Sequence, residues 1–154
     1  MPIELIRWAH ILGATVLLGT GAGIAFFMVM AHQTKDAKII SHVAGTVVIA
    51  DWIFTASTVV VQPITGVWLA ASMGWPLTST WIIWSVGLYV FTGAFWLPVV
   101  WIQHPLRDMA RLAADTDNPL PDQYFKLYRI WFACGFPAFI AVLAIIWLMI
   151  ARPI

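Results

Sequence analysis

The stretch VVIADWIFTASTVVVQPITGVWLA, residues 47–70, has the hydropathy of a membrane-spanning helix, yet its fifth residue is an aspartate. A helix rises about 1.5 Å per residue, so this stretch is long enough to cross the ~30 Å hydrocarbon layer of a bilayer. A charged side chain inside that layer costs at least about 2.5 kcal/mol. We therefore expect Asp51 to face protein or water, or to be neutral.

The composition of the whole chain agrees with that local pattern. Of the 154 residues, 62% are hydrophobic and only 10% are charged, which lies outside the usual range of soluble domains. Hydropathy divides the chain into four segments long enough to span a bilayer, at roughly 5–31, 43–71, 81–103 and 128–150. We predict an all-α integral membrane four-helix bundle, formed by a single domain over residues 1–154.

The basic residues predict how this bundle is oriented. Six of them lie in or beside the first and third connections: Lys35, Lys38, Arg107, Arg111, Lys126 and Arg129. Only Arg7 and Arg152 lie on the other side. The positive-inside rule then predicts a multi-pass protein of the bacterial inner (cytoplasmic) membrane, with both long connections in the cytoplasm and both termini extracytoplasmic.

Two further patterns concern the membrane boundaries. The stretch PLRDMARLAADTD, residues 105–117, is typical of a short interfacial helix that ends at the following NPLP. Trp75 and Trp81 near the outer boundary, and Tyr124 and Tyr128 near the inner one, are typical of aromatic belts.

Several function classes are disfavoured by what the sequence lacks. The net charge of +1 leaves no basic patch for nucleic acid. Cys134 is the only cysteine, so the chain can form neither an internal disulfide nor a clustered thiolate metal site. The sequence contains no HExxH motif, no phosphate-binding loop and no nucleophile paired with a base, which argues against ordinary hydrolytic chemistry.

A polar face runs along the second segment. Its members follow at steps of four, three, four and three: Asp51, Thr55, Thr58, Gln62 and Thr65. This spacing stacks them on one side of a helix over about 21 Å, a side that we expect to point inward. Threonine hydroxyls in membranes commonly bond back to their own helix, but this does not account for Asp51 and Gln62. The alternatives are a cavity, a cofactor pocket or a proton or polar pathway through Asp51, Thr55, Thr58 and Gln62, or else structural bonding between helices.

The first segment carries a matching stripe. His10, Gly13, Leu17 and Gly21 lie near one side, and Gly19 and Gly23 have GxxxG spacing. We expect something to approach this backbone closely, either a neighbouring helix or the flat edge of a macrocycle. His10 itself is either a hydrogen-bonded interfacial group or a ligand.

Other side chains suggest further ligand contacts. His32, His42 and His104 fall at the inner ends of three segments, where together they could form a cluster able to bind a metal or haem. The third segment places Ser85, Tyr89, Thr92 and Trp96 at helical spacing. This aromatic stripe is either core packing or the lining of a cofactor site, and ten tryptophans in so short a chain favour a large flat ligand.

Three stretches carry a resemblance to known families. RWAHILGATVLLGTG, ADWIFTASTVVVQPITGVWLA and TGAFWLPVVWIQ together resemble a family of small bacterial predicted integral membrane proteins, over nearly the whole chain. More distantly, the layout resembles the haem-containing bacterial protoporphyrinogen oxidases and the copper-resistance D-type membrane proteins. In the oxidase pattern, histidines near the start and end of the first helix fall on His10 and His32, and a proline closely followed by a glycine falls on Pro63 and Gly66.

The chain also departs from the oxidase pattern. Ser85 follows Trp81 where the oxidases carry a lysine, and the later histidine of that helix falls near Trp96. Because the catalytic lysine is missing, the resemblance favours a shared bundle over protoporphyrinogen oxidation itself, and whether the protein is an enzyme stays open.

The resemblance implies a b-type haem in the membrane. His10 would be an axial ligand, with His32 as a second candidate for binding iron. The surrounding contacts would come from Gly13, Gly21, Gln62, Tyr89 and Trp96. A single ligand from this chain would leave the iron five-coordinate, unless another subunit of a homo-oligomer supplied the sixth ligand. Such a protein would serve in electron transfer or redox handling of a hydrophobic partner such as quinone, or with another redox protein. The alternative hypothesis is a cofactor-free carrier or accessory subunit that uses the Asp51 face.

Overall fold

The computed structural model describes residues 2–152, which form long helices joined by short connections. The elements are α1 (Ile3–Thr34), α2 (Ala37–Ala50), the π-helix η1 (Asp51–Thr55), α3 (Ala56–Ser72), α4 (Thr80–Thr116) and α5 (Asp122–Ala151). α2, η1 and α3 follow one another without a break, so the described chain has four helices long and apolar enough to cross a membrane, and no strand. The predicted all-α membrane four-helix bundle is confirmed.

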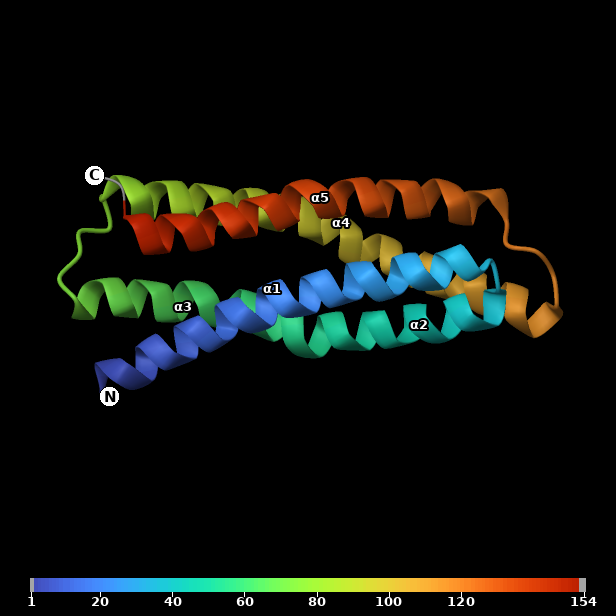
Figure 1. The fold of residues 1–154 in the computed structure, drawn as a ribbon, viewed down its shortest axis with the longest axis horizontal. Helices are drawn as coiled ribbons and strands as arrows, with labels where there is room; N and C mark the ends of the chain where they lie inside the picture. Colours follow the sequence, from blue (N-terminus) through green and yellow to red (C-terminus); the bar gives the residue numbers. More distant parts are fainter. Residues whose placement is uncertain (1, 153–154) are drawn as a thin grey trace.

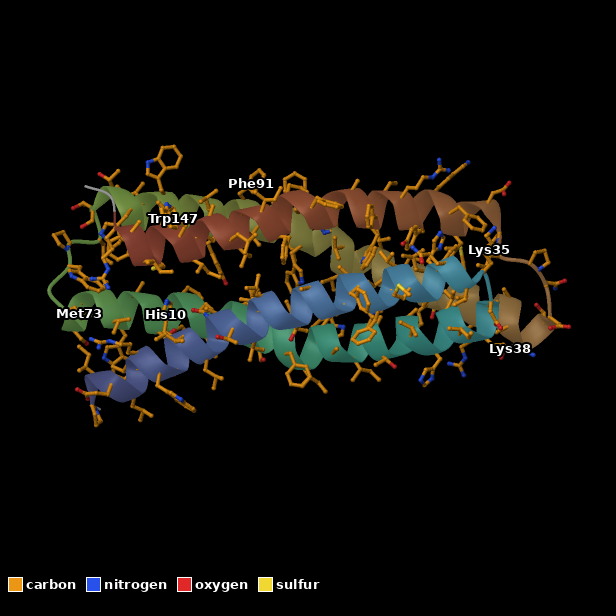
Figure 2. The ribbon with its side chains drawn as sticks, viewed as in Figure 1. His10, Lys35, Lys38, Met73, Phe91 and Trp147 are labelled. Carbon is orange, nitrogen blue, oxygen red and sulfur yellow. The ribbon has the colours of Figure 1, made fainter. Side chains whose placement is uncertain are left out.

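The bundle has two distinct ends. Both termini and the α3–α4 connection lie at one end, which we call the terminal end (Figure 1). The α1–α2 and α4–α5 connections lie at the other, which we call the basic end because Lys35 and Lys38 are there (Figure 2). His10 lies in the terminal half, between α1 and α3.

α4 is longer than predicted and bends along its course (Figure 1). It continues through Pro98 and Pro105 to Thr116, so the helix predicted over residues 105–117 is present and ends before NPLP, but it is a continuation of the third span and not a short helix of its own. Leu106 and Ala110 are fully buried, and this packing holds the continuation in place despite the prolines. Its 37 residues span roughly 55 Å, more than the hydrocarbon layer, so the helix extends beyond it.

The hydrophobic core lies in the basic half, where all four long helices meet. Its buried residues are Ile24, Met28 and Ala31 of α1, Ile40, Ala44 and Val47 of α2, Leu106 and Ala110 of α4, and Tyr124, Tyr128 and Trp131 of α5. Tyr124 and Tyr128 are therefore buried rather than part of an interfacial belt, which corrects the prediction. They face inward because they stack on His32, whose ring centroid lies 3.7 Å from that of Tyr128.

The terminal half is packed as two pairs of helices. α1 packs against α3, and α4 packs against α5, while the two pairs separate toward the terminal end (Figure 1). Buried residues follow the same division, with Ile6 and Ala70 on the first pair and Ile82 and Ala141 on the second.

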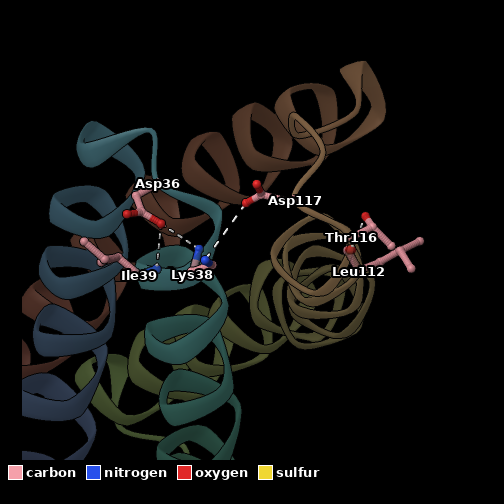
Figure 3. A network of polar contacts seen from close by, with 6 residues as sticks. All are labelled: Asp36, Lys38, Ile39, Leu112, Thr116 and Asp117. Carbon is pink, nitrogen blue, oxygen red and sulfur yellow. Dashed lines mark hydrogen bonds and ion pairs between the residues drawn. The ribbon is translucent and has the colours of Figure 1, made fainter.

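Hydrogen bonds and an ion pair connect the chain segments at the basic end. Asp36 caps α2 by accepting from the backbone N–H groups of Lys38 at 2.8 Å and Ile39 at 3.4 Å. Lys38 Nζ in turn lies 4.0 Å from Asp117 Oδ1, at the end of α4 (Figure 3). Both side chains of this ion pair are well exposed, so the pair contributes little to stability and serves mainly to bring the two connections together.

One hydrogen bond between the two helix pairs supplies a donor to a carbonyl of α3 that has no helical partner. Pro63 has no N–H, so the carbonyl of Val59, four residues earlier, loses its helical partner. The hydroxyl of Tyr89 on α4 donates to that carbonyl. In lipid no water is present to replace this donor. The tyrosine hydroxyl therefore gives the Val59 carbonyl its hydrogen-bond donor and links α3 to α4.

This arrangement predicts a specific pattern in a double-mutant cycle. Tyr89→Phe should lower the free energy of unfolding by about 1 kcal/mol, because it leaves the Val59 carbonyl without a donor. Pro63→Ala supplies the missing N–H, so Tyr89→Phe should cost clearly less in that background. Thr92→Val, one turn along α4, is the control, because that hydroxyl bonds only to its own helix at Leu88. Equal costs in both backgrounds, measured by denaturation in detergent, would contradict the pairing.

The uneven distribution of basic residues predicts that the basic end is cytoplasmic. Thr116 is exposed at that end, so a cysteine placed there, with Cys134 replaced by alanine, should resist a membrane-impermeant maleimide in intact cells. The same cysteine should react once the cells are opened. Labelling of intact cells would reverse the orientation and place both termini in the cytoplasm.

Candidate functional site

The polar face of the second long helix is turned inward, as predicted. Asp51, Thr55, Thr58 and Gln62 are buried, and Thr65 is partly buried. The helix that carries them meets different partners along its length, so the face divides into two sites. We call them the His10 site, between α1 and α3, and the Asp51 site, where η1 meets α4.

The hydrogen bonds of the His10 site favour one tautomer of the imidazole ring. His10 Nδ1 lies 2.8 Å from the hydroxyl oxygen of Thr65. That hydroxyl has a single hydrogen, which it donates to backbone carbonyls one turn earlier, with the Val61 oxygen at 2.8 Å. Thr65 therefore accepts from His10, Nδ1 carries the ring proton, and Nε2 keeps its lone pair. A neutral imidazole held through Nδ1–H is the usual state of a metal-binding histidine.

Two glycines create the space for this contact. Gln62 Nε2 donates to the carbonyl of His10 at 2.9 Å, and a Cβ on Gly13 would lie 2.8 Å from that nitrogen. A Cβ on Gly66 would lie 3.2 Å from His10 Cε1. The predicted close approach to the α1 backbone is thus confirmed at Gly13, where the partner is a neighbouring helix. At Gly19, Gly21 and Gly23 no atom of the described chain lies within 4 Å of an added Cβ, so no neighbouring helix of this chain makes the close approach there.

The Asp51 site contains polar atoms without partners. Trp96 Nε1 donates to Asp51 Oδ1 at 3.3 Å, and Thr55 and Gln103 lie beside the same carboxyl group. Neither of those two is in hydrogen-bonding geometry, however. The buried atoms without a partner are Asp51 Oδ2, Thr55 Oγ1, Gln103 Nε2, Gln103 Oε1 and Trp131 Nε1. These atoms come from three different elements of the bundle.

The π-helix explains why Thr55 differs from its neighbours. η1 bonds the N–H of Ala56 to the carbonyl of Asp51, five residues earlier, which disturbs the regular α-helical ladder. Ser57 and Thr58 follow the π-helix in sequence. Their hydroxyls donate to the carbonyls of Ile53 and Phe54 inside it. Back-bonding therefore accounts for Thr58 and Thr65, as one interpretation of the sequence held, but it leaves Thr55 unaccounted for.

The residues predicted to line a cofactor do not all come together. His10, Gly13 and Gln62 form one group. Trp96 instead contacts Asp51, which lies about 21 Å from Thr65 along the helix, and Tyr89 contacts Val59 between them. Gly21 is about 16 Å from His10 along α1. The predicted set is thus spread over most of the membrane.

The four histidines also lie apart. His10 and His32 are separated by about 33 Å along α1, so they cannot bind the same iron. His32 Nδ1 lies 3.3 Å from the Tyr124 hydroxyl, His104 Nδ1 donates to the Val100 carbonyl at 2.9 Å, and His42 is exposed. Among residues 2–152, no group of three or more His, Cys, Asp or Glu side chains is arranged to hold a metal ion, so the predicted inner histidine cluster is not formed.

Two buried polar residues were not expected from the sequence: Gln103 of the Asp51 site, and Trp131, which lines the same gap as Gln103. A signal for Gln103 was present, because it follows Trp96 by seven residues and so continues the stripe of Ser85, Tyr89, Thr92 and Trp96. Trp131 had no such signal. It belongs to an apolar helix, and only the tertiary structure brings its indole N–H into the core without a partner.

The contact at Gly13 generates a prediction with an internal control. Gly13→Ala should lower the melting temperature in detergent, because the added methyl group displaces Gln62 from the His10 carbonyl. Gly21→Ala introduces the same group on the same helix where nothing lies within 4 Å, and should leave the melting temperature unchanged or slightly higher. Equal behaviour of the two variants would show that the α1–α3 contact is not as close as described.

Comparison with known proteins supports the overall assignment. Comparisons with curated proteins and with solved structures gave no match. The model of the predicted integral membrane protein family DUF2269 matches residues 4–153. Because the match covers nearly the whole chain and the fold contains the expected membrane-spanning helices, the protein belongs to the DUF2269 family of predicted integral membrane proteins.

Proposed function

We propose that this integral membrane protein binds haem b through His10 and serves in electron transfer or in redox handling of a hydrophobic partner such as quinone. The observation that carries the proposal is the state of His10. Its Nδ1–H is held by Thr65, and its Nε2 keeps a free lone pair inside a membrane-spanning bundle. An imidazole in this state is the commonest axial ligand of haem iron in proteins.

The residues around His10 fit part of this role. Thr65 orients the ring, Gly66 leaves room for it, and Gln62 fixes the backbone that carries it. A bound haem would supply reversible one-electron chemistry within the membrane. The room for the haem ring matches the proposal less well than the state of His10 does. The gap beside Gln103 and Trp131 is too narrow for even a water molecule and cannot take the ring. The proposal therefore requires the two helix pairs of the terminal half to admit the ring between them.

The same proposal includes the setting of the protein. The family supports an integral membrane protein, and we propose the bacterial inner membrane as its location. The basic end, if cytoplasmic, places His10 toward the extracytoplasmic side. With His32 about 33 Å away, a sixth ligand would have to come from another subunit of a homo-oligomer, and otherwise the iron is five-coordinate.

Absorption spectroscopy tests this proposal directly. Protein purified in detergent from haem-replete cells should show a Soret band and haem b in a pyridine haemochrome assay. His10→Ala should lose that haem, because the iron loses its ligand. His42→Ala and His32→Ala are matched controls and should keep it, since one side chain is exposed and the other stacks on Tyr128 at the far end of α1. Protein without haem, or haem unchanged in His10→Ala, would reject the proposal.

A second function has its own supporting observation. The buried atoms without partners at the Asp51 site favour a cofactor-free carrier or accessory subunit, because such atoms in the middle of a membrane protein commonly mark a substrate or ion pathway. A protein that is stable, folded and colourless in the experiment above would favour this function over haem binding.

A further inference from the structure

The Asp51 site holds four unpartnered polar atoms in the interior of a membrane protein, and a fifth, Trp131 Nε1, belongs to a residue that lines the same gap as Gln103. Asp51, Gln103 and Trp131 are each 4% exposed, and Thr55 is 3% exposed. Each unpaired polar group buried away from water costs free energy, and the membrane supplies no water to relieve it. The free-energy cost of burying several such groups together is offset only if the groups form hydrogen bonds with one another in a second arrangement of the site.

The chemistry of these atoms indicates what that other state is. Gln103 has a carbonyl oxygen and an amide nitrogen, both without partners, and a rotation of the amide exchanges them. Thr55 has a rotating hydroxyl that can donate or accept. Both groups lie beside the Asp51 carboxyl and can therefore pair with either of its charge states. A carboxylate would accept from the amide N–H and the hydroxyl, whereas a carboxylic acid would donate to the amide carbonyl.

We infer that Asp51, Thr55 and Gln103 form a proton-binding site, in which the Gln103 amide turns over as Asp51 gains or loses its proton. The proton enters from water and adds to Asp51 Oδ2, and the new O–H donates to Gln103 Oε1. When the proton leaves, Gln103 Nε2 and the Thr55 hydroxyl donate to the carboxylate. Asp51 Oδ1 accepts from Trp96 Nε1 in the structure, so this bond anchors the carboxyl group while its other oxygen changes partner.

The surroundings favour a proton over a metal cation. The site offers four side-chain oxygens, fewer than hard cations usually require, and one of them, Asp51 Oδ1, already accepts from the N–H of Trp96. The adjoining void is too narrow for a water molecule, so no hydration shell can make up the coordination. Among the described residues, His104 of α4 is the other titratable group near Asp51, and its Nδ1 donates to the Val100 carbonyl.

The inference goes beyond haem binding and does not depend on it. His10 and Thr65 lie about 21 Å along the bundle from Asp51, so the two sites can be tested separately. A His10→Ala variant should show the same Asp51 signals as the unmodified protein.

Infrared difference spectroscopy between acid and alkaline pH, on the full chain in lipid nanodiscs, tests the inference. The unmodified protein should show the carbonyl band of a protonated carboxylic acid, shifted by exchange into D₂O, together with a change in a side-chain amide band. Asp51→Asn should lose the carboxylic acid band. Gln103→Leu should keep that band but move it to higher frequency, because the acid loses its partner, and should lose the amide change.

Asp115→Asn is the matched control for the loss of a carboxyl group. Asp115 lies on α4 beside Arg111, its side chain is 70% exposed, and its removal should leave the acid band unchanged. If Asp51→Asn does not fold, the frequency shift in Gln103→Leu still decides the question. The inference is overturned if the acid band is missing at every pH at which the protein stays folded, or if Gln103→Leu leaves its frequency unchanged. Replacement of choline by Na⁺ that removes the band at constant pH would instead identify a metal cation site.

Discussion

Polar groups inside a bilayer have no water to bond to, so each one must find a partner within the protein. In this chain most hydroxyl groups bond back to their own helix, and a few partners lie between helices. Gln62 of α3 donates to the His10 carbonyl of α1, and Tyr89 of α4 donates to the carbonyl that Pro63 leaves free in α3. These bonds set which helices approach closely, because each requires the neighbouring backbone to lie within reach of one side chain. The first of these bonds requires glycine at position 13, because a Cβ there would collide with the Gln62 side chain.

The same constraint separates the two candidate sites. At the His10 site nearly every polar group is paired, which fixes the ring and leaves one nitrogen free for a ligand. At the Asp51 site the groups are near one another but largely unpaired. A fully paired site is suited to holding a fixed ligand, whereas a partly paired one is suited to changing its bonds. The two sites therefore favour different kinds of chemistry within one bundle.

Much of the fold could be predicted from sequence because its signals are local. The four apolar segments and the inward polar face follow from hydropathy and helical spacing, and both agree with the structure. The π-helix at Asp51–Thr55 had no such signal, because it depends on how α2 and α3 meet their neighbours. The helix past Pro105 was expected, but its unbroken junction with the third span was missed for a related reason, since tertiary burial of Leu106 and Ala110 outweighs the local effect of proline.

The candidate sites were predicted less well, because they depend on contacts between distant parts of the chain. Spacing placed His10, Gln62 and Asp51 on inward faces, but it could not show that His10 meets Thr65 while Trp96 meets Asp51. One cofactor site was therefore predicted where the structure has two separate groups. The indole N–H of Trp131 shows this most clearly, because no local pattern along α5 indicates that it lies in the core without a partner.

The position of Asp51 within the bundle means that its hydrogen bond affects how the two helix pairs are joined. The four-helix core includes Val47, one turn before Asp51, and beyond Asp51 the helices continue as two separate pairs. Asp51 and its partner Trp96 therefore form one of the few contacts that join the pairs where the common core ends. A hydrogen bond to a carboxylate is stronger than one to a neutral acid. A change in the charge on Asp51 consequently alters how firmly α4 is held to the π-helix, at the point from which the two pairs diverge.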